Sequence, residues 1–262
     1  MMANDMTSAF TLVRQNMKDD SVEFKQRNVE DAETMHSDAD LLRASREWFE
    51  LASRHRYSYH FSWMGRPIIQ FPGDIIAMQE IIWEVKPDLI IETGIARGGS
   101  IIFYASMLEL IGGDGMVLGI DIDIREHNRI AIEEHPMYKR ITLLEGSSID
   151  GDIVQRVREI ASTRERVMVV LDSNHTHDHV LAELQAYAGL VSAGSFCVVL
   201  DTVIEEMSDE AFPDRPWSIG NNPMTAVDEF LTSTDRFEID SHIDNKLLLT
   251  VAPRGYLRCV KN

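Results

Sequence analysis

Acidic residues follow four short apolar runs in this chain, at positions 92, 121, 172 and 201. Runs such as Leu89-Ile90-Ile91 are typical of buried parallel strands. Because the carboxyl ends of parallel strands meet at one edge of a sheet, we expect these carboxylates to gather there. Carboxylate oxygens bind divalent cations and accept hydrogen bonds from amines and hydroxyls. The pattern therefore predicts a small-molecule site that includes a metal ion.

The metal signal is the pair Asp172 and Asp201. Each follows a buried run, Val167–Leu171 for the first and Phe196–Leu200 for the second. Two oxygen ligands then lie on adjacent strand ends, where Mg²⁺ can bridge them. Acids that follow strands also cap helices, so a structural role for Asp172 is the alternative. The pair predicts Mg²⁺ as a cofactor.

Three histidines follow Asp172, at positions 175, 177 and 179. His175 and His179 would share one face of a helix, which is compatible with zinc binding. His175 is alternatively a general base, and a third possibility is that all three histidines are solvated residues at a helix start. We assign His175 and Asp172 as the candidate catalytic residues, with the other two interpretations open.

The turn between Glu92 and Ser100 predicts a cofactor site. Gly94 and Gly98 allow the positive backbone dihedrals or close approach that a strand-to-helix reversal needs. Ala96 replaces the middle glycine of the dinucleotide fingerprint, which disfavours a nicotinamide cofactor. Glu92 places a carboxylate where a ligand amine can sit, and its spacing from the glycines resembles E/D-x-G-x-x-x-G of class I S-adenosylmethionine (SAM) methyltransferases. We predict Glu92, Gly94, Gly98 and Ser100 as cofactor residues; the alternative is a turn without a ligand.

Two further positions are predicted to bind the nucleoside part of such a cofactor. Asp121 ends the second strand and can accept hydrogen bonds from both ribose hydroxyls. Asp123 is the competing residue, or a helix cap. Ser148 follows the third strand and either contacts the adenine or belongs, with Asp150, to the start of the next helix.

The order of these patterns predicts an α/β protein with a Rossmann-like, doubly wound and mostly parallel seven-stranded sheet. Residues 61–262 are predicted to form the methyltransferase domain, and residues 1–60 a helical extension with an amphipathic helix from Asp40 to His55. Two short strands, 237–240 and 246–252, are predicted as an antiparallel final pair. The aromatic segment 57–67 is predicted to be irregular, and 205–223 to form a lid over the substrate.

Composition limits the partners. The net charge of −18 opposes binding to a polyanion, so we expect no nucleic acid partner. The two cysteines, Cys197 and Cys259, form no disulfide framework or zinc spacing. We find neither a signal sequence nor an apolar run of about 20 residues, and therefore expect a cytoplasmic protein without membrane segments.

Several motifs together resemble the cephalosporin hydroxylase and rhamnosyl O-methyltransferase family, over about residues 61 to 256. They are Ser62-Trp-Met-Gly65, Pro72-Gly-Asp74, Ile91-Glu-Thr-Gly-Ile-Ala-Arg-Gly-Gly-Ser100, Gly119-Ile-Asp-Ile-Asp123, Leu171-Asp-Ser-Asn-His175, Asp201-Thr202, Gly220-Asn-Asn-Pro223 and Ala252-Pro-Arg-Gly-Tyr256.

The resemblance implies a SAM- and Mg²⁺-dependent O-methyltransferase that acts on hydroxyls of sugars or antibiotic-type natural products and forms homo-oligomers. It implies Asp172, Asp201 and Thr202 as metal residues. It also places His175 where catechol-type relatives have a catalytic lysine, and Leu200 where relatives can have a glutamate. A cephalosporin-hydroxylase-like oxidoreductase and a non-catalytic SAM-binding subunit are the alternative functions.

Overall fold

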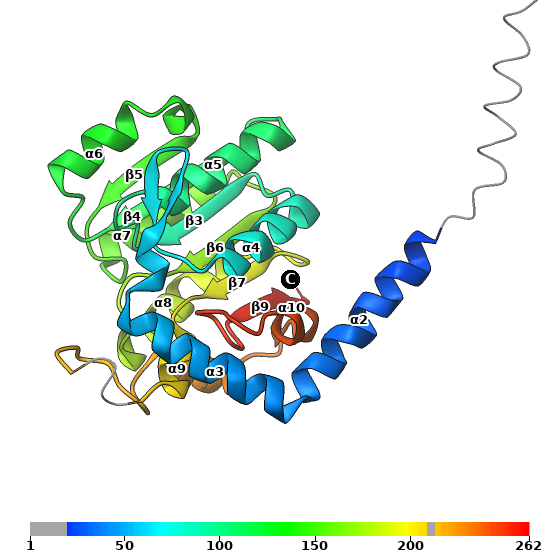
Figure 1. Ribbon diagram of the computed structural model, residues 1–262. Helices are drawn as coiled ribbons and strands as arrows, with labels where there is room; N and C mark the ends of the chain where they lie inside the picture. The colour runs from blue at the N-terminus through cyan, green and yellow to red at the C-terminus, as the bar shows by residue number, and fades with distance from the viewer. Residues whose placement is uncertain (1–19, 209–212, 262) are drawn as a thin grey trace, which may run out of the picture.

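The computed structural model describes residues 20–208 and 213–261, and the predicted extension before residue 20 lies outside them. Its centre is a seven-stranded sheet with helices on both faces (Figure 1). Five neighbouring strands of the sheet are parallel, and β9 pairs antiparallel with both β7 and β8. In spatial order the strands are β5 (Ile141–Glu145), β4 (Met116–Asp121), β3 (Leu89–Thr93), β6 (Val167–Leu171), β7 (Phe196–Val199), β9 (Tyr256–Cys259) and β8 (Phe237–Ile239). The predicted fold class is confirmed.

Two hydrophobic cores lie on the two faces of the sheet. Ile90 and Met168 point into one core, and Leu89 and Ile91 point into the other. Successive strand residues face opposite sides, so strands covered on both faces need continuous apolar sequence. This explains why the central strands lack the polar–apolar alternation of half-exposed strands.

Helices of the N-terminal half and α10 supply the first core, and helices of the C-terminal half supply the second. The first group is α3 (Ala39–Arg54), α4 (Pro72–Val85), α5 (Gly99–Ile111), α6 (Glu126–Glu133) and α10 (Ser241–Lys246), and the second is α7 (Gly151–Ala161), α8 (His177–Tyr187) and α9 (Pro223–Ser233). Short 3₁₀ turns are η1 (Tyr57–His60), η2 (Pro136–Arg140), η3 (Ala188–Leu190) and η4 (Thr202–Glu206). No helix in the described part of the chain has both the length and the hydropathy needed to cross a membrane.

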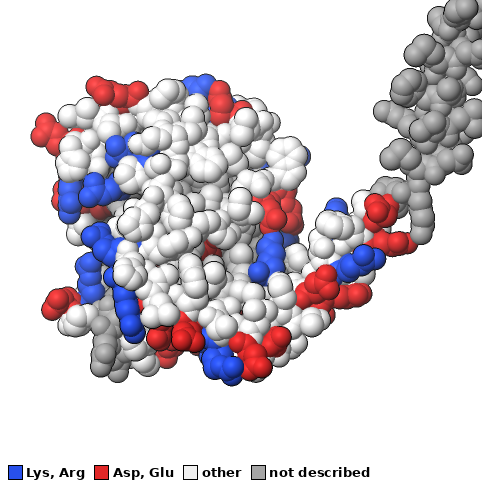
Figure 2. Space-filling model, in the orientation of Figure 1, with Lys and Arg blue, Asp and Glu red and all other residues white. Residues whose placement is uncertain are grey.

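The N-terminal helices form an arm. The predicted helix from Asp40 to His55 is present as α3, and its Phe49 stacks on Phe71 with ring centroids 4.6 Å apart. The preceding helix, α2 (Ser21–Ser37), leads away from the sheet (Figure 1), and Figure 2 shows it as a projection with acidic and basic side chains interspersed. The predicted domain boundary at residue 60 falls between η1 and the next strand and stays a prediction.

The predicted strand 246–252 is wrong. Lys246 ends α10, residues 247–252 have no regular structure, and the last strand is β9, at 256–259. The buried carboxylate of Asp74 accepts hydrogen bonds from the Thr250 hydroxyl and the Val251 backbone N–H. The segment is therefore held by a side chain of α4, and a neighbouring strand does not pair with it.

The aromatic segment 57–67 is more regular than predicted. It contains the hairpin of β1 (Phe61–Trp63) and β2 (Arg66–Ile68), joined by Met64 and Gly65. Both turn residues have positive φ, 44° and 85°, which is the backbone of the two-residue turns that suit a hairpin. The hairpin packs against α5, beside the glycine turn.

Candidate active site

The predicted acids gather where the strand order reverses. The chain runs from β3 to β4 and β5 on one side and then crosses back to β6 on the other side of β3, and this reversal opens a crevice at the carboxyl ends of the strands. Glu92 lies within β3, Asp121 ends β4, and Asp172 and Asp201 follow β6 and β7. Tertiary structure therefore brings all four carboxylates to one edge of the sheet.

Gly94 lets the cofactor turn touch the end of β6. Its φ is +83°, and a Cβ at this position would lie 2.0 Å from the backbone oxygen of Asp172. Gly98 also has positive φ and precedes the first residue of α5. The close approach that Gly94 permits is thus to protein backbone, and it joins the two halves of the site.

Glu92 is fully buried in this crevice. Its Oε2 accepts a hydrogen bond of 2.7 Å from the Ser100 hydroxyl, while Oε1 makes no hydrogen bond of good geometry among the described residues and has the buried Tyr104 hydroxyl nearby. Burial raises the pKa of Glu92 to about 8, against the opposing effects of Ser100 and Tyr104. Ser100 consequently orients the carboxylate and leaves one oxygen for a ligand.

Gln70 is a candidate ligand residue that the sequence reasoning missed. It is 2% exposed, and within residues 20–208 and 213–261 its amide makes no hydrogen bond of good geometry, although the buried Tyr104 hydroxyl lies beside it. It lines a small cavity over the glycine turn together with Ser100 and Asp172. Buried polar groups without partners cost about 1–3 kcal/mol each, so they mark places where a ligand belongs. In the sequence, the indication for Gln70 was that it is a lone polar residue in an apolar stretch.

Asp121 already holds the glycine turn. Its Oδ2 accepts from the backbone N–H groups of Ile95 and Ala96 at 3.0 and 3.2 Å. Asp123, the competing ribose residue, is exposed and lies 3.9 Å from Arg125. Asp121 Oδ1 accepts from the Asp123 backbone N–H at 3.2 Å, so about one of the roughly four lone-pair sites of the carboxylate stays free for a ribose hydroxyl, and that role stays a prediction.

Asp172, His175 and Asp201 form a group whose ligand atoms all lie within 4.8 Å of one another. His175 Nε2 is 3.1 Å from Asp201 Oδ2. Burial, and then the carboxylates of Asp201 and Glu92, raise the pKa of Asp172 well above its usual range. The group is thus an electronegative site whose repulsion a cation would relieve.

Thr202, predicted as a metal residue, is turned toward the protein. Its side chain is fully buried, and its hydroxyl donates a 2.6 Å hydrogen bond to the Pro253 carbonyl. This bond ties the residue after Asp201 to the C-terminal segment. Thr202 therefore steadies Asp201, and a direct role at the metal stays a prediction.

The other two histidines have different surroundings. His177 contacts the Thr225 hydroxyl at 2.9 Å and the Glu229 carboxylate at 3.2 Å, both on α9. His179 Nε2 lies 3.1 Å from the hydroxyls of Ser148 and Ser173. Among the described residues, only His175 of the three joins the aspartates, so the alternative in which His175 and His179 share a zinc ion is not assembled.

Ser148 does not cap the following helix. Asp150 is the N-cap of α7, and Ser148 lies buried against His179. The predicted contact of Ser148 with adenine remains open.

The predicted lid contributes one described aromatic residue to the metal group. The Trp217 ring meets the His175 ring edge-on, with centroids 4.7 Å apart. Its indole N–H is buried and has no partner in the described part of the chain. Trp217 therefore helps to orient His175 and offers a free donor beside the site.

Comparison with known proteins identifies the family. The family model for rhamnosyl O-methyltransferase/CmcI matches residues 55–260. The rhamnosyl O-methyltransferase of Mycobacterium bovis (strain BCG / Pasteur 1173P2) is 30% identical over 201 residues, covering 75% of this chain and 77% of the relative. That of Mycobacterium leprae is 28% identical over 198 residues, covering 75% and 82%.

Solved structures share the fold. A CmcI structure described as a Mg–SAM complex has a TM-score of 0.56 at 20% identity, covering 78% of each chain. An O-methyltransferase from Bacillus cereus in complex with SAH has a TM-score of 0.51 at 15% identity, covering 83% of this chain and 91% of that one. The predicted enzyme class is confirmed: the chain belongs to the rhamnosyl O-methyltransferase/CmcI family and is a SAM-dependent O-methyltransferase.

Proposed function

We propose that this enzyme transfers the methyl group of SAM to a hydroxyl of a sugar or natural-product scaffold, at a Mg²⁺-type metal site held by Asp172 and Asp201. The observation that carries the proposal is the pair of aspartates, grouped with His175 beside the buried Glu92 at the strand reversal. The rhamnosyl O-methyltransferase relatives and the family match support a sugar-like acceptor.

The site fits SAM, which carries an ammonium and a sulfonium group. Ser100 and Asp172 line the cavity, and the Ser100 hydroxyl is bonded to the Glu92 carboxylate behind it. The second carboxylate oxygen of Glu92 suits an ammonium donor. Gln70 adds an amide to the lining of the same cavity. We assign Glu92, Gly94, Gly98, Ser100, Asp121 and Ser148 to cofactor binding.

The aspartates also fit a divalent cation. Mg²⁺ prefers oxygen ligands, and Asp172 and Asp201 supply two carboxylates. When bound, such a cation lowers the pKa of a coordinated hydroxyl and stabilises the developing alkoxide charge. The protein's own contribution is to hold both oxygens at adjacent strand ends, so that acceptor and methyl donor are positioned before reaction. His175 would serve either as proton acceptor or as a third ligand.

Glu92 makes SAM binding dependent on pH. With a pKa of about 8, raised by burial, Glu92 carries a proton at pH 7 in the free enzyme. The ammonium of SAM favours the carboxylate, so binding should release a proton, and SAM affinity should rise with pH up to about 8, by at most about tenfold per unit. Calorimetry at pH 7 in buffers of different ionisation enthalpy measures this release.

Glu92→Gln should remove the dependence on buffer and weaken SAM binding. Asp114→Asn, at an exposed acid that precedes β4, is the matched control and should behave like the wild type. Proton release that persists in Glu92→Gln would show that another group titrates.

Turnover with SAM tests the proposed reaction. Candidate rhamnosides and other glycosides are incubated with SAM and the enzyme, with and without chelator, and products are scored by the mass of one added methyl group. Metal-dependent methylation of a hydroxyl supports the proposal. SAM binding without transfer to any acceptor would favour the non-catalytic alternative, for which the buried Leu200 at a position where relatives can have a glutamate is the motivating observation.

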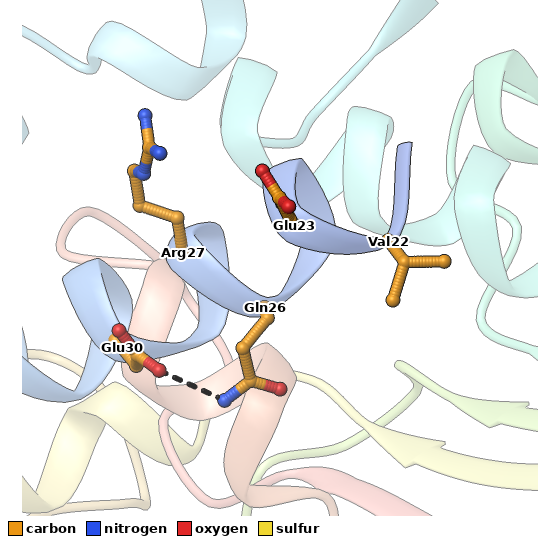
Figure 3. Close-up of a pocket in the computed structure, with 5 residues that line it drawn as sticks. All are labelled: Val22, Glu23, Gln26, Arg27 and Glu30. Carbon is orange, nitrogen blue, oxygen red and sulfur yellow. Dashed lines mark hydrogen bonds between the residues drawn. The ribbon is translucent and has the colours of Figure 1, made fainter. Parts of the chain in front are cut away.

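We propose that α2 mediates assembly into a homo-oligomer. Val22 and Phe24 of this helix are 76% and 62% exposed. The helix also borders a shallow groove, shown in Figure 3, which is lined by Val22, Glu23, Gln26, Arg27 and Glu30. This groove contains none of the active-site residues. A projecting helix with large exposed apolar side chains is typical of a surface that a second subunit covers.

Light scattering at micromolar protein should therefore give a multiple of the 29.8 kDa chain mass. Phe24→Ser should lower that mass, whereas Leu110→Ser, at a 77% exposed position on α5, should not. A monomeric wild-type mass would contradict the proposed assembly.

A further inference from the structure

Among the described residues, the metal group contains two carboxylates, those of Asp172 and Asp201. Leu200 precedes Asp201 and is 2% exposed, within the core on the α4 and α5 side of the sheet. Its backbone N–H donates to the Leu171 carbonyl at 3.0 Å, which continues the pairing of β6 with β7. The Leu200 side chain therefore offers no metal ligand, and any third protein ligand comes from another residue.

We propose that His175 is this third ligand and binds the metal through Nε2, which makes the centre a site of two carboxylates and one imidazole. The inference rests on the proposed metal-assisted methyl transfer. Its basis is that one ligand atom from each of Asp172, His175 and Asp201 falls within 4.8 Å of the others.

The separation of Nε2 from Asp201 Oδ2 agrees with ligation. The two atoms are 3.1 Å apart. Adjacent ligands on a cation with bonds of about 2.1 Å are separated by roughly 3.0–3.4 Å in octahedral or tetrahedral geometry. The pair is therefore already spaced as neighbouring ligands before any ion is bound.

Local structure keeps the imidazole in this position. His175 lies in the short turn between β6 and α8, where the Asn174 carboxamide oxygen accepts from both the backbone N–H and the hydroxyl of Thr176 at 3.0 Å. The Trp217 ring packs against the imidazole in a T-shaped arrangement. The side chain is 17% exposed. Little rearrangement is needed for Nε2 to meet a cation.

An imidazole ligand changes which metal the site prefers. Mg²⁺ favours oxygen ligands, whereas first-row transition ions such as Mn²⁺ accept nitrogen as well. We therefore expect this site to prefer Mn²⁺ over Mg²⁺, and the ratio of the two affinities should exceed that of a site with oxygen ligands alone. A ligating Nε2 also has no lone pair left to take the proton of the acceptor hydroxyl, so the ligand and base roles exclude one another.

The test is metal binding to the full chain. Calorimetry measures the affinities for Mg²⁺ and Mn²⁺, and pulsed electron paramagnetic resonance detects the ligands of bound Mn²⁺. The wild type should show nitrogen hyperfine coupling to Mn²⁺. His175→Ala should lose that coupling and bind Mn²⁺ about tenfold or more weakly, with a smaller loss for Mg²⁺. His175→Asp should recover Mg²⁺ affinity without nitrogen coupling, and so reduce the Mn²⁺/Mg²⁺ affinity ratio.

His177→Ala is the matched control, because that histidine contacts α9 and lies outside the metal group. It should retain the nitrogen coupling. Wild-type Mn²⁺ without nitrogen coupling, or an unchanged Mn²⁺ affinity in His175→Ala, would overturn the inference and leave His175 as a proton acceptor. Methyl transfer measured on the same samples separates the ligand assignment from the proposed function. Turnover without nitrogen coupling would contradict only the ligand assignment. Nitrogen coupling without turnover would contradict only the proposed function.

Discussion

Asp172→Asn should lower methyl transfer by about 10³-fold or more while leaving SAM affinity nearly unchanged. Asn keeps the volume of the side chain but removes one of two negative ligands, so a divalent cation loses much of its binding energy. Loss of several kcal/mol of metal-derived stabilisation corresponds to a rate loss of this order. Single-turnover kinetics at saturating SAM, with SAM affinity from calorimetry, measure both quantities.

Misfolding would not explain such a loss. Burial and neighbouring carboxylates raise the pKa of Asp172 in the folded state, so the neutral form is the one that folding favours. Stability linked to this group is fully present below about pH 4, the unfolded pKa, and is lost as pH rises through the higher folded pKa. The neutral Asn removes that loss, so the metal-free variant should be at least as stable as the wild type at pH 7.

Two further variants make the result specific. Asp201→Asn should behave like Asp172→Asn, and its left-handed backbone, with φ of 57°, is one that Asn tolerates. Asp178→Asn replaces an exposed acid six residues after Asp172 and should retain turnover. Full activity of either metal-site variant, or of the wild type in excess chelator, would remove the metal from the mechanism.

Gly94→Ala should destabilise the fold by about 3 kcal/mol or more. The added Cβ would lie 2.0 Å from the Asp172 backbone oxygen, a contact that only movement of β3 or β6 can relieve. Overpacking that shifts backbone costs about 1–3 kcal/mol, and the positive φ adds about 1–2 kcal/mol. Because the same movement separates Glu92 from Asp172, activity should fall even in the folded fraction.

The matched control is Gly113→Ala. Gly113 also has positive φ, +74°, but a Cβ there meets nothing within 4 Å. It should cost only the conformational part, about 1–2 kcal/mol. Urea unfolding of both variants measures the difference in the free energy of unfolding. Equal losses would show that the contact with Asp172 has no energetic weight.

Local patterns were sufficient for the strands and the acids that follow them. The apolar runs before Glu92, Asp121 and Asp172 correspond to β3, β4 and β6, because strands buried on both faces require continuous apolar sequence. The rule that parallel strands end at one edge then placed their carboxylates together. These inferences depend on neighbours in sequence and on general topology alone.

Long-range contacts caused the errors. Residues 246–252 have the apolar content of a strand, yet Asp74, more than 170 residues earlier, binds Thr250 and Val251 and holds the segment outside the sheet. The need of Gln70 for a ligand was equally invisible, because its lack of a hydrogen bond of good geometry depends on everything packed around it.

The sequence by itself determined that this chain would present carboxylates at the open edge of a doubly wound sheet, since that outcome follows from strand pattern and chain order. Only the tertiary structure decided which histidine meets them. His175, His177 and His179 are indistinguishable by residue type, but α9 takes His177 through Thr225 and Glu229, and the serines after β5 and β6 take His179. His175 alone of the three reaches Asp172 and Asp201, because hydrogen bonds and metal ligation act over only a few ångströms and depend on which segments the fold brings together.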